Sequence, residues 1–125
     1  MRSARVFVAG RDEPDEISGA DVVVVAANAS DDVIDDIRRR APNAVVVVVG
    51  DSPHNVCEGT LFPRARIIGV ASEAEAEVVV DAVVNDLDKE VESVVRCEGE
   101  RGIEGEFARV PVRIGASGVR EIIEN

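Results

Sequence analysis

The residues whose types could do chemistry stand in polar turns, each soon after a short apolar run. His54 is the chain's one histidine, and it lies two positions after Ser52. Asn28 and Gly10 follow earlier apolar runs. If those runs are parallel strands, these residues meet beyond the carboxyl ends, where open α/β sheets bind ligands. The sequence therefore predicts four candidate cofactor-binding residues: Gly10, Asn28, Ser52 and His54.

His54 suggests acid–base chemistry, because an imidazole titrates near neutral pH. Asp51 and Ser52 precede it in the same turn, so the residue types match those of a Ser/His/Asp catalytic triad. Catalytic groups must converge in space, however, and neighbours along one turn usually diverge. We interpret His54 as a solvated loop histidine and predict no catalytic residue; a general acid or base is the alternative.

Gly10 could begin a phosphate-binding turn. The dinucleotide fingerprint needs further glycines two and five positions later, followed by a helix. Those positions hold Asp12 and Asp15, whose carboxylates would repel a pyrophosphate. The sequence thus contains no dinucleotide fingerprint.

Neither the acidic cluster nor the cysteines predict a metal site. Cys57 and Cys97 lack the CxxC spacing of zinc ligands, so we expect reduced thiols. Four aspartates resemble metal ligands in number alone, and we expect them on the solvated side of a helix. They are Asp31, Asp32, Asp35 and Asp36.

The elements that would position these residues alternate between strands and helices. Four apolar runs predict strands, over residues 5–9, 21–27, 44–49 and 65–70. The Val-rich runs 21–27 and 44–49 have the pattern of strands buried on both faces. Ser30 can cap a helix to residue 40, and Ser72 with Glu75 forms a capping box for a helix over 72–87. Strands that alternate with helices predict an α/β fold with a parallel sheet.

The last third of the chain has a different pattern. Residues 91–98 and 106–114, separated by a glycine-rich segment, predict an antiparallel hairpin. Pro111 lacks an N–H, which predicts that the second of these strands lies at the sheet edge. After a turn at 115–118, residues 119–124 predict a short final helix.

Composition limits the possible partners. The 125 residues include 25 acidic and 14 basic ones, a net charge of −11, with Lys89 as the one lysine. Such a surface repels nucleic acid and anionic membranes and suits a salt-rich cytoplasm, so we expect a halophilic source. No apolar run approaches the roughly 18 residues of a membrane span, and the N-terminus does not resemble a signal peptide. We expect one cytoplasmic domain over residues 1–125.

Several segments together resemble the lactate/malate dehydrogenases. GADVVVVAANAS resembles the family's fourth strand, GADVVVITAG, and APNAVVVVVGDSPHNV resembles its PNA-x-VVVV-TNPVD stretch. FPRARIIGV is similar to FPR-x-RVIG, and residues 81–125 follow the family's carboxyl-terminal hairpin region. The resemblance implies a truncated Rossmann-like sheet with flanking helices and a C-terminal antiparallel β-hairpin. Its parallel strands would correspond to the family's first, fourth, fifth and sixth.

The resemblance also implies which functional segments are missing. The phosphate loop would fall between Gly10 and Ser18, the arginine-bearing loop after Ala27, and the catalytic segment after Val70. Ser52 stands at the family's TNP asparagine, and His54 does not match its catalytic histidine. We therefore expect a catalytically degenerate lactate/malate dehydrogenase-like protein without a cofactor, acting through protein association. The alternative is an NAD(H)- or nucleotide-binding oxidoreductase of the malate/lactate dehydrogenase type with residual activity.

The buried strands also bear on oligomeric state. Strands that are apolar on both faces need cover on both, and the chain offers few helices to supply it. This predicts a two-fold homodimer through the helix over 72–87, whose valines form a wide surface: Val78, Val79, Val80, Val83 and Val84. The alternative is a monomer in which the C-terminal hairpin folds over the open face.

Overall fold

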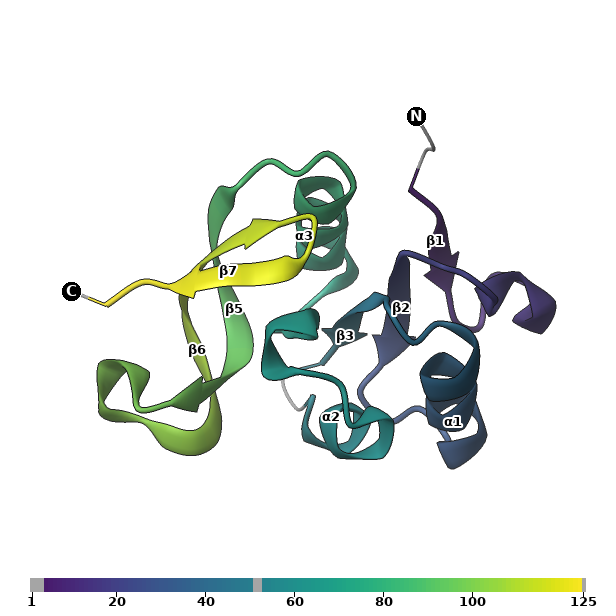
Figure 1. Ribbon diagram of the computed structural model, residues 1–125, viewed down its shortest axis with the longest axis horizontal. Coiled ribbons are helices and arrows are strands. Elements are labelled where there is room, and N and C mark those ends of the chain that lie inside the picture. The colour runs from purple at the N-terminus through teal and green to yellow at the C-terminus, as the bar shows by residue number, and fades with distance from the viewer. Residues whose placement is uncertain (1–3, 51–52, 125) are drawn as a thin grey trace.

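The computed structural model describes residues 4–50 and 53–124, which form one seven-stranded sheet (Figure 1). The strands follow one another across the sheet in chain order. The parallel strands are β1 (Val6–Val8), β2 (Val22–Ala26), β3 (Val45–Val49) and β4 (Ile67–Val70). The antiparallel strands are β5 (Lys89–Glu98), β6 (Glu104–Gly115) and β7 (Gly118–Ile122). The predicted α/β fold class is confirmed.

Helices cover both faces of the parallel strands. One face carries η1 (Pro14–Ile17), α1 (Asp31–Arg40) and α2 (His54–Thr60), and the other carries α3 (Glu73–Val84). Alternate residues of a strand point to opposite faces, so successive valines of β3 join different core clusters. None of the described helices is both long and apolar enough to cross a membrane.

The two longer helices begin where their serines predict. The hydroxyls of Ser30 and Ser72 each accept a hydrogen bond from the backbone N–H three positions later. α3 ends at Val84, earlier than the predicted 87. Asp86 follows in the left-handed region, with φ of 49°, which is incompatible with a continuing α-helix.

The structure contains a helix, α2, where the sequence predicted only a polar turn and a connection. α2 has seven residues and follows Pro53 without a side-chain N-cap hydrogen bond. Its N-cap position is therefore held by Pro53, whereas a serine holds that position in the other two helices.

Two predictions for the C-terminal region are wrong. Residues 119–124 form no helix; a tight turn between Gly115 and Gly118 reverses the chain, and β7 pairs with β6. Consequently β6 lies between β5 and β7 and is not an edge strand. Pro111 is tolerated because its carbonyl accepts the Ile123 N–H, so its nitrogen faces the end of β7 rather than β5.

The antiparallel strands curve over the α3 side of the sheet (Figure 1). β4 and β5 are joined by a single residue pair, Gly69 with Val94, and beyond it the two strands diverge. Buried side chains of β6 then pack in one cluster with β3 and α3; they are Val110, Val112 and Ile114. The C-terminal hairpin thus supplies cover that the monomer alternative requires.

The valine surface of α3 is narrower than predicted. Val79 and Val83 are buried against the sheet, and Val78 is 40% exposed. Val80 and Val84 are half-buried. The exposed large apolar residues of the described chain lie on separate elements or turns: Val6, Leu61, Val78 and Leu87.

Candidate functional site

The carboxyl ends of β1, β2 and β3 meet at one edge of the sheet, as the sequence predicts. The ladder continues beyond the strands, where the Ala9 N–H donates to Val24 O and the Ala27 N–H to Val49 O. Gly10, Asn28 and His54 follow these three strand ends. Ser52, like Asp51, lies outside the described residues. The topology therefore brings three of the four candidates to one edge.

The turn after β1 is closed by its own hydrogen bonds. The N–H groups of Arg11 and Asp12 both donate to Val8 O, at 3.2 and 2.9 Å. In return, Asp12 Oδ2 accepts the Val8 N–H at 2.8 Å. Gly10 makes the turn possible with a φ of 87°, a conformation that favours glycine. The turn thus holds a carboxylate whose side chain is 24% exposed.

This turn does not fit the phosphates of a dinucleotide. A phosphate needs free backbone N–H groups and the N-terminus of a helix. Here the amides of Arg11 and Asp12 are bonded to Val8, and a one-turn 3-10 helix, η1, follows. The Asp12 carboxylate adds a negative charge at the same place.

His54 is a solvated residue of a helix. It is the first residue of α2, and its side chain is 61% exposed. Its Nε2 lies 3.3 Å from Glu58 Oε1 one turn later, and its ring meets Phe107 edge-on with centroids 6.4 Å apart. This environment agrees with the interpretation as a solvated histidine, although the residue belongs to a helix and not to a loop.

Asn28 is exposed in the turn between β2 and α1. The neighbouring turns approach each other closely there: a Cβ on Gly50, whose φ is 124°, would lie 2.8 Å from the Ala27 Cβ. The two turns are therefore packed at Gly50 and Ala27, while the neighbouring Asn28 is exposed.

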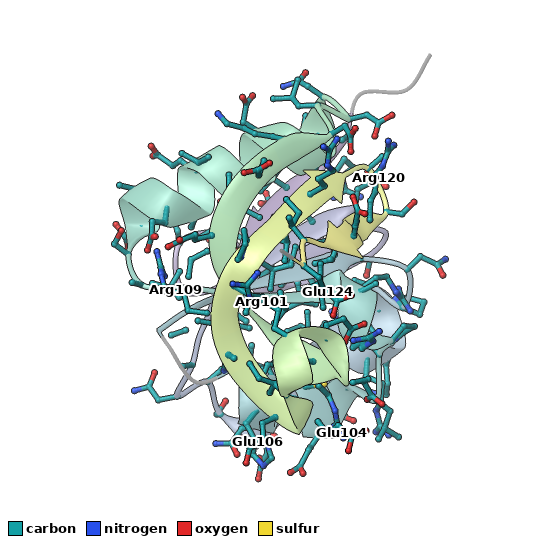
Figure 2. The ribbon with its side chains drawn as sticks, turned by 90° about the vertical axis from the view of Figure 1, so that its left-hand side faces the viewer. Arg101, Glu104, Glu106, Arg109, Arg120 and Glu124 are labelled. Atoms are coloured by element: carbon teal, nitrogen blue, oxygen red, sulfur yellow. The ribbon has the colours of Figure 1, made fainter. Side chains whose placement is uncertain are left out.

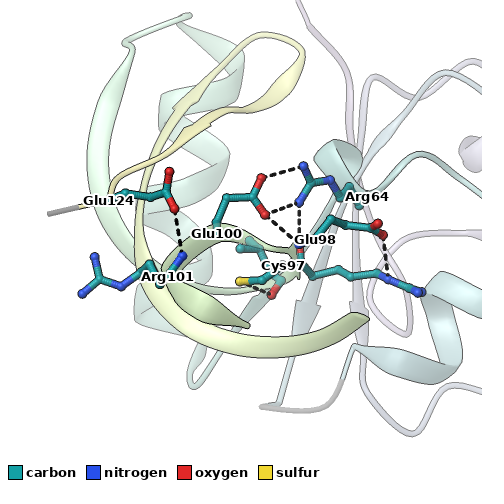
Figure 3. Close-up of polar contacts among 8 residues, drawn as sticks. Arg64, Cys97, Glu98, Glu100, Arg101 and Glu124 are labelled. Atoms are coloured by element: carbon teal, nitrogen blue, oxygen red, sulfur yellow. Dashed lines mark hydrogen bonds and ion pairs between the residues drawn. The ribbon is translucent and has the colours of Figure 1, made fainter. Parts of the chain in front are cut away.

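The sequence did not reveal a network of arginines and glutamates that links η2 to the antiparallel strands (Figure 3). Arg64, in η2 (Arg64–Arg66), donates to both oxygens of Glu100, at 2.9 and 2.8 Å, and also to Arg96 O. Glu100 begins η3 (Glu100–Gly102), between β5 and β6. The hydrogen bonds that the Glu100 carboxylate accepts, first from Arg64 and then from the backbone N–H groups of Glu98 and Glu100, lower its pKa from 4.5 to about 2.

A cavity of about 290 Å³ lies beside this network. η2, β5, η3 and β7 line it, and each of its charged side chains lies in an ion pair: Arg64 with Glu100, Arg96 with Glu98, Arg120 with Asp86, and Glu121 with Arg113. Figure 2 shows the labelled arginines of the antiparallel region, Arg101, Arg109 and Arg120, well apart on the surface. Because the arginines that line the cavity are each paired with a carboxylate, the cavity does not favour an anionic ligand.

Strand order and crossovers define an α/β protein with a Rossmann-like sheet. Its architecture is similar to that of solved malate and lactate dehydrogenases. The malate dehydrogenase of Aeropyrum pernix aligns with 91% of this chain and 70% of its own, at 17% identity and a TM-score of 0.75. The lactate dehydrogenase of Cryptosporidium parvum was solved with lactic acid and nicotinamide adenine dinucleotide. It aligns with 91% of this chain and 71% of its own, at 14% identity and a TM-score of 0.81. The lactate dehydrogenase of Eimeria maxima, solved with NADH and oxamate, aligns with 91% of this chain and 69% of its own, at 13% identity and a TM-score of 0.81.

In sequence, the malate dehydrogenase of Chlorobium phaeobacteroides is 41% identical over 54 residues. That match covers 43% of this chain and 17% of the relative, so it spans a small part of the relative's length. No protein-family model matches the chain. The chain has the fold of the lactate and malate dehydrogenases, and the resemblance inferred from its motifs is confirmed at the level of the fold. The order β1-β2-β3-β4 also agrees with strands 1, 4, 5 and 6 of a doubly wound sheet.

Proposed function

We propose that this chain is a catalytically degenerate relative of the lactate and malate dehydrogenases, which keeps their fold without their hydride-transfer site. The observation that carries the proposal is the Asp12 carboxylate bonded to the Val8 N–H. It stands in the first strand-to-helix turn, where a doubly wound sheet receives a dinucleotide's pyrophosphate. A carboxylate at that position repels phosphate, and the amides of the turn are bonded to Val8.

The environment of His54 supports the same proposal. Catalysis of hydride transfer depends on charged and acid–base groups held in fixed geometry and shielded from water. His54 is largely exposed and paired with Glu58 of its own helix. A solvent-exposed imidazole is a poor substitute for such a preorganised base.

The alternative is an NAD(H)- or nucleotide-binding oxidoreductase of the malate/lactate dehydrogenase type. The observation that favours it is the shared sheet edge of Gly10, Asn28 and His54. Two structures with the same fold were solved with nicotinamide cofactors. Under this alternative the cofactor is NAD, and Ser52 belongs to the same site.

Thermal unfolding with and without NAD⁺ or NADH distinguishes the two. A ligand at about 100 times its Kd stabilises a native protein by about 2.7 kcal/mol. We expect no shift in Tm at millimolar cofactor and no oxidation of malate or lactate above background. A saturable shift that Asn28→Ala and His54→Ala remove, and that Ser117→Ala in the β6–β7 turn preserves, would favour the alternative.

We further propose that the chain acts through protein association in the cytoplasm, with a second copy as its first partner. The apolar support for a two-fold dimer is α3, where Val78 is exposed and Val80 and Val84 are half-buried. Glu77 is exposed on the same helix, so a pair of α3 helices would associate best in molar salt. Sedimentation equilibrium in molar KCl tests the dimer; a mass near 13.3 kDa at micromolar concentration contradicts it.

A further inference from the structure

β1 is the exposed edge of the sheet, whereas the first strand of a doubly wound sheet has a neighbour on both sides. An edge strand presents unpaired N–H and C=O groups to other chains, and proteins usually block such edges. In this chain β1 pairs with β2 alone among the described strands. The outer side of β1 therefore needs a block other than a neighbouring strand.

The pairing register shows which groups face outward. Arg5 O accepts the Val22 N–H, and the Ala9 N–H donates to Val24 O, so the odd-numbered residues of this segment bond to β2. The backbone groups of Val6 and Val8 consequently point to the open edge. Both are positions at which another strand could bind.

The turn after β1 occupies the Val8 position completely. The Val8 N–H donates to Asp12 Oδ2, and Val8 O accepts the N–H groups of Arg11 and Asp12. The Asp12 side chain is three-quarters buried, and its other oxygen lies 3.6 Å from Arg11 Nε. Val6 is 37% exposed, and no described residue bonds to its outward backbone groups. The open edge is thus reduced to one residue.

We propose that residues 9–12 form a latch over the β1 edge, held by the Asp12 carboxylate, which prevents a second copy of the chain from adding its own β1. Two β1 edges are self-complementary in an antiparallel two-fold arrangement, with Val6 of each copy opposite Val8 of the other. That pairing needs the Val8 N–H and C=O, which the latch withholds. The latch rests on the same Asp12–Val8 hydrogen bond as the proposed function and goes beyond it, because it concerns strand pairing at β1 and not cofactor binding.

The test compares variants of Asp12 by sedimentation equilibrium in molar KCl, where repulsion between the acidic chains is screened. Asp12→Ala removes the acceptor for the Val8 N–H, and we expect twice the mass of the wild-type species. Asp12→Asn keeps an oxygen acceptor without the charge, and we expect the wild-type mass. Adding Val6→Pro to Asp12→Ala removes an outward N–H and should restore the wild-type mass.

Hydrogen exchange on the wild-type protein tests the latch even if Asp12→Ala fails to fold. The Val8 amide should exchange at least about tenfold more slowly than the Val6 amide, the ratio expected from one typical net hydrogen bond. Equal exchange at Val6 and Val8 overturns the latch. So does a folded Asp12→Ala variant whose mass equals that of the wild type. The latch and the proposed function share the Asp12–Val8 hydrogen bond, but their readouts differ. The mass of Asp12→Ala tests the latch, whereas the effect of NADH on Tm tests the proposed function, so the two can fail independently.

Discussion

Arg64 and Glu100 face each other as a two-pronged pair, with both guanidinium Nη groups donating to the two carboxylate oxygens. The pair joins η2, which leads into the last parallel strand, to η3, which connects β5 and β6. It therefore fastens the antiparallel part of the sheet to the parallel part. Paired geometry of this kind is stronger and more specific than a single surface ion pair.

Removal of this pair should weaken the fold in a pH-dependent way. The folded-state pKa of Glu100, about 2, is lower than its ordinary value of 4.5. The pair therefore stabilises the protein fully above about pH 5, and the stabilisation is lost as the pH falls from 4.5 towards 2. We expect Arg64→Ala to lower Tm at pH 7 by roughly 3–5 °C, a shift typical of one lost interaction in a domain of this size.

The measurement is Tm from pH 2 to 7 for wild type, Arg64→Ala and Glu100→Gln. The difference from wild type should shrink towards pH 2 for both variants. Glu104→Gln, which changes an exposed glutamate of the neighbouring strand, serves as the control. A difference that is constant with pH contradicts the assignment to Glu100.

Local signals predicted most of the fold. The Val-rich runs marked β1 to β4, and Ser30 and Ser72 marked the starts of α1 and α3, because strand burial and helix capping act over a few residues. The strand β7 was not predicted, because the apolar spacing of residues 119–124 also suits a helix. Its strand conformation depends on the turn at Gly118 and on pairing with β6.

The candidate site was predictable as a place and less so as a geometry. Topology put Gly10, Asn28 and His54 at one sheet edge, because parallel strands end together. From the sequence, Asp12 was predicted only to repel a pyrophosphate. Its hydrogen bond to the Val8 N–H depends on the backbone conformation of the turn, which the sequence did not reveal. The Arg64–Glu100 pair spans 36 positions, and no local pattern links two residues so far apart.

Ser93 should be replaceable with a gain in stability. The residue is fully buried in β5 opposite Val110, and its Oγ has no hydrogen-bond partner among the described residues. A buried, unbonded hydroxyl costs free energy that an apolar group of similar size does not. We expect Ser93→Ala to raise the free energy of unfolding by about 1 kcal/mol. Urea unfolding measures this, with exposed Ser117→Ala as the neutral control; a loss of stability in Ser93→Ala would show that the hydroxyl is bonded.

Stability should rise with salt, because the net charge is −11. The Debye length is about 30 Å at 0.01 M ionic strength and about 3 Å at 1 M, so repulsion across the whole molecule is screened in molar KCl. On α3, Glu73 and Glu77 are exposed and contribute to that repulsion. We expect Tm to increase by several degrees between the two conditions.

Two variants check the origin of the salt effect. Glu73→Gln with Glu77→Gln should narrow the difference in Tm, whereas Lys89→Gln should widen it by making the net charge more negative. Equal Tm values for the wild type at low and molar salt would contradict the halophilic interpretation of the composition.

Gly118 should be the glycine of the C-terminal hairpin least tolerant of a side chain. Its φ is 99°, and a Cβ there would lie 2.1 Å from Ala65 O, where β7 packs on η2. Gly102 also has a positive φ, 75°, but a Cβ on it would meet no atom within 4 Å. Gly102→Ala therefore carries backbone strain alone, about 1–2 kcal/mol. Gly118→Ala carries the same strain and must also move β7 away from η2.

Urea midpoints of the two variants separate strain from steric exclusion. We expect Gly118→Ala to lose more than about 3 kcal/mol, or to lose the packing of β7 while the parallel strands stay folded. That packing places β6 and β7 over the α3 side of the sheet, where Val119 and Ile122 join the core around Ile114. The larger loss therefore also exposes apolar surface, which a dye for exposed apolar groups detects. Equal losses in the two variants would mean that β7 does not rest on Ala65 and that the cover of the sheet has another source.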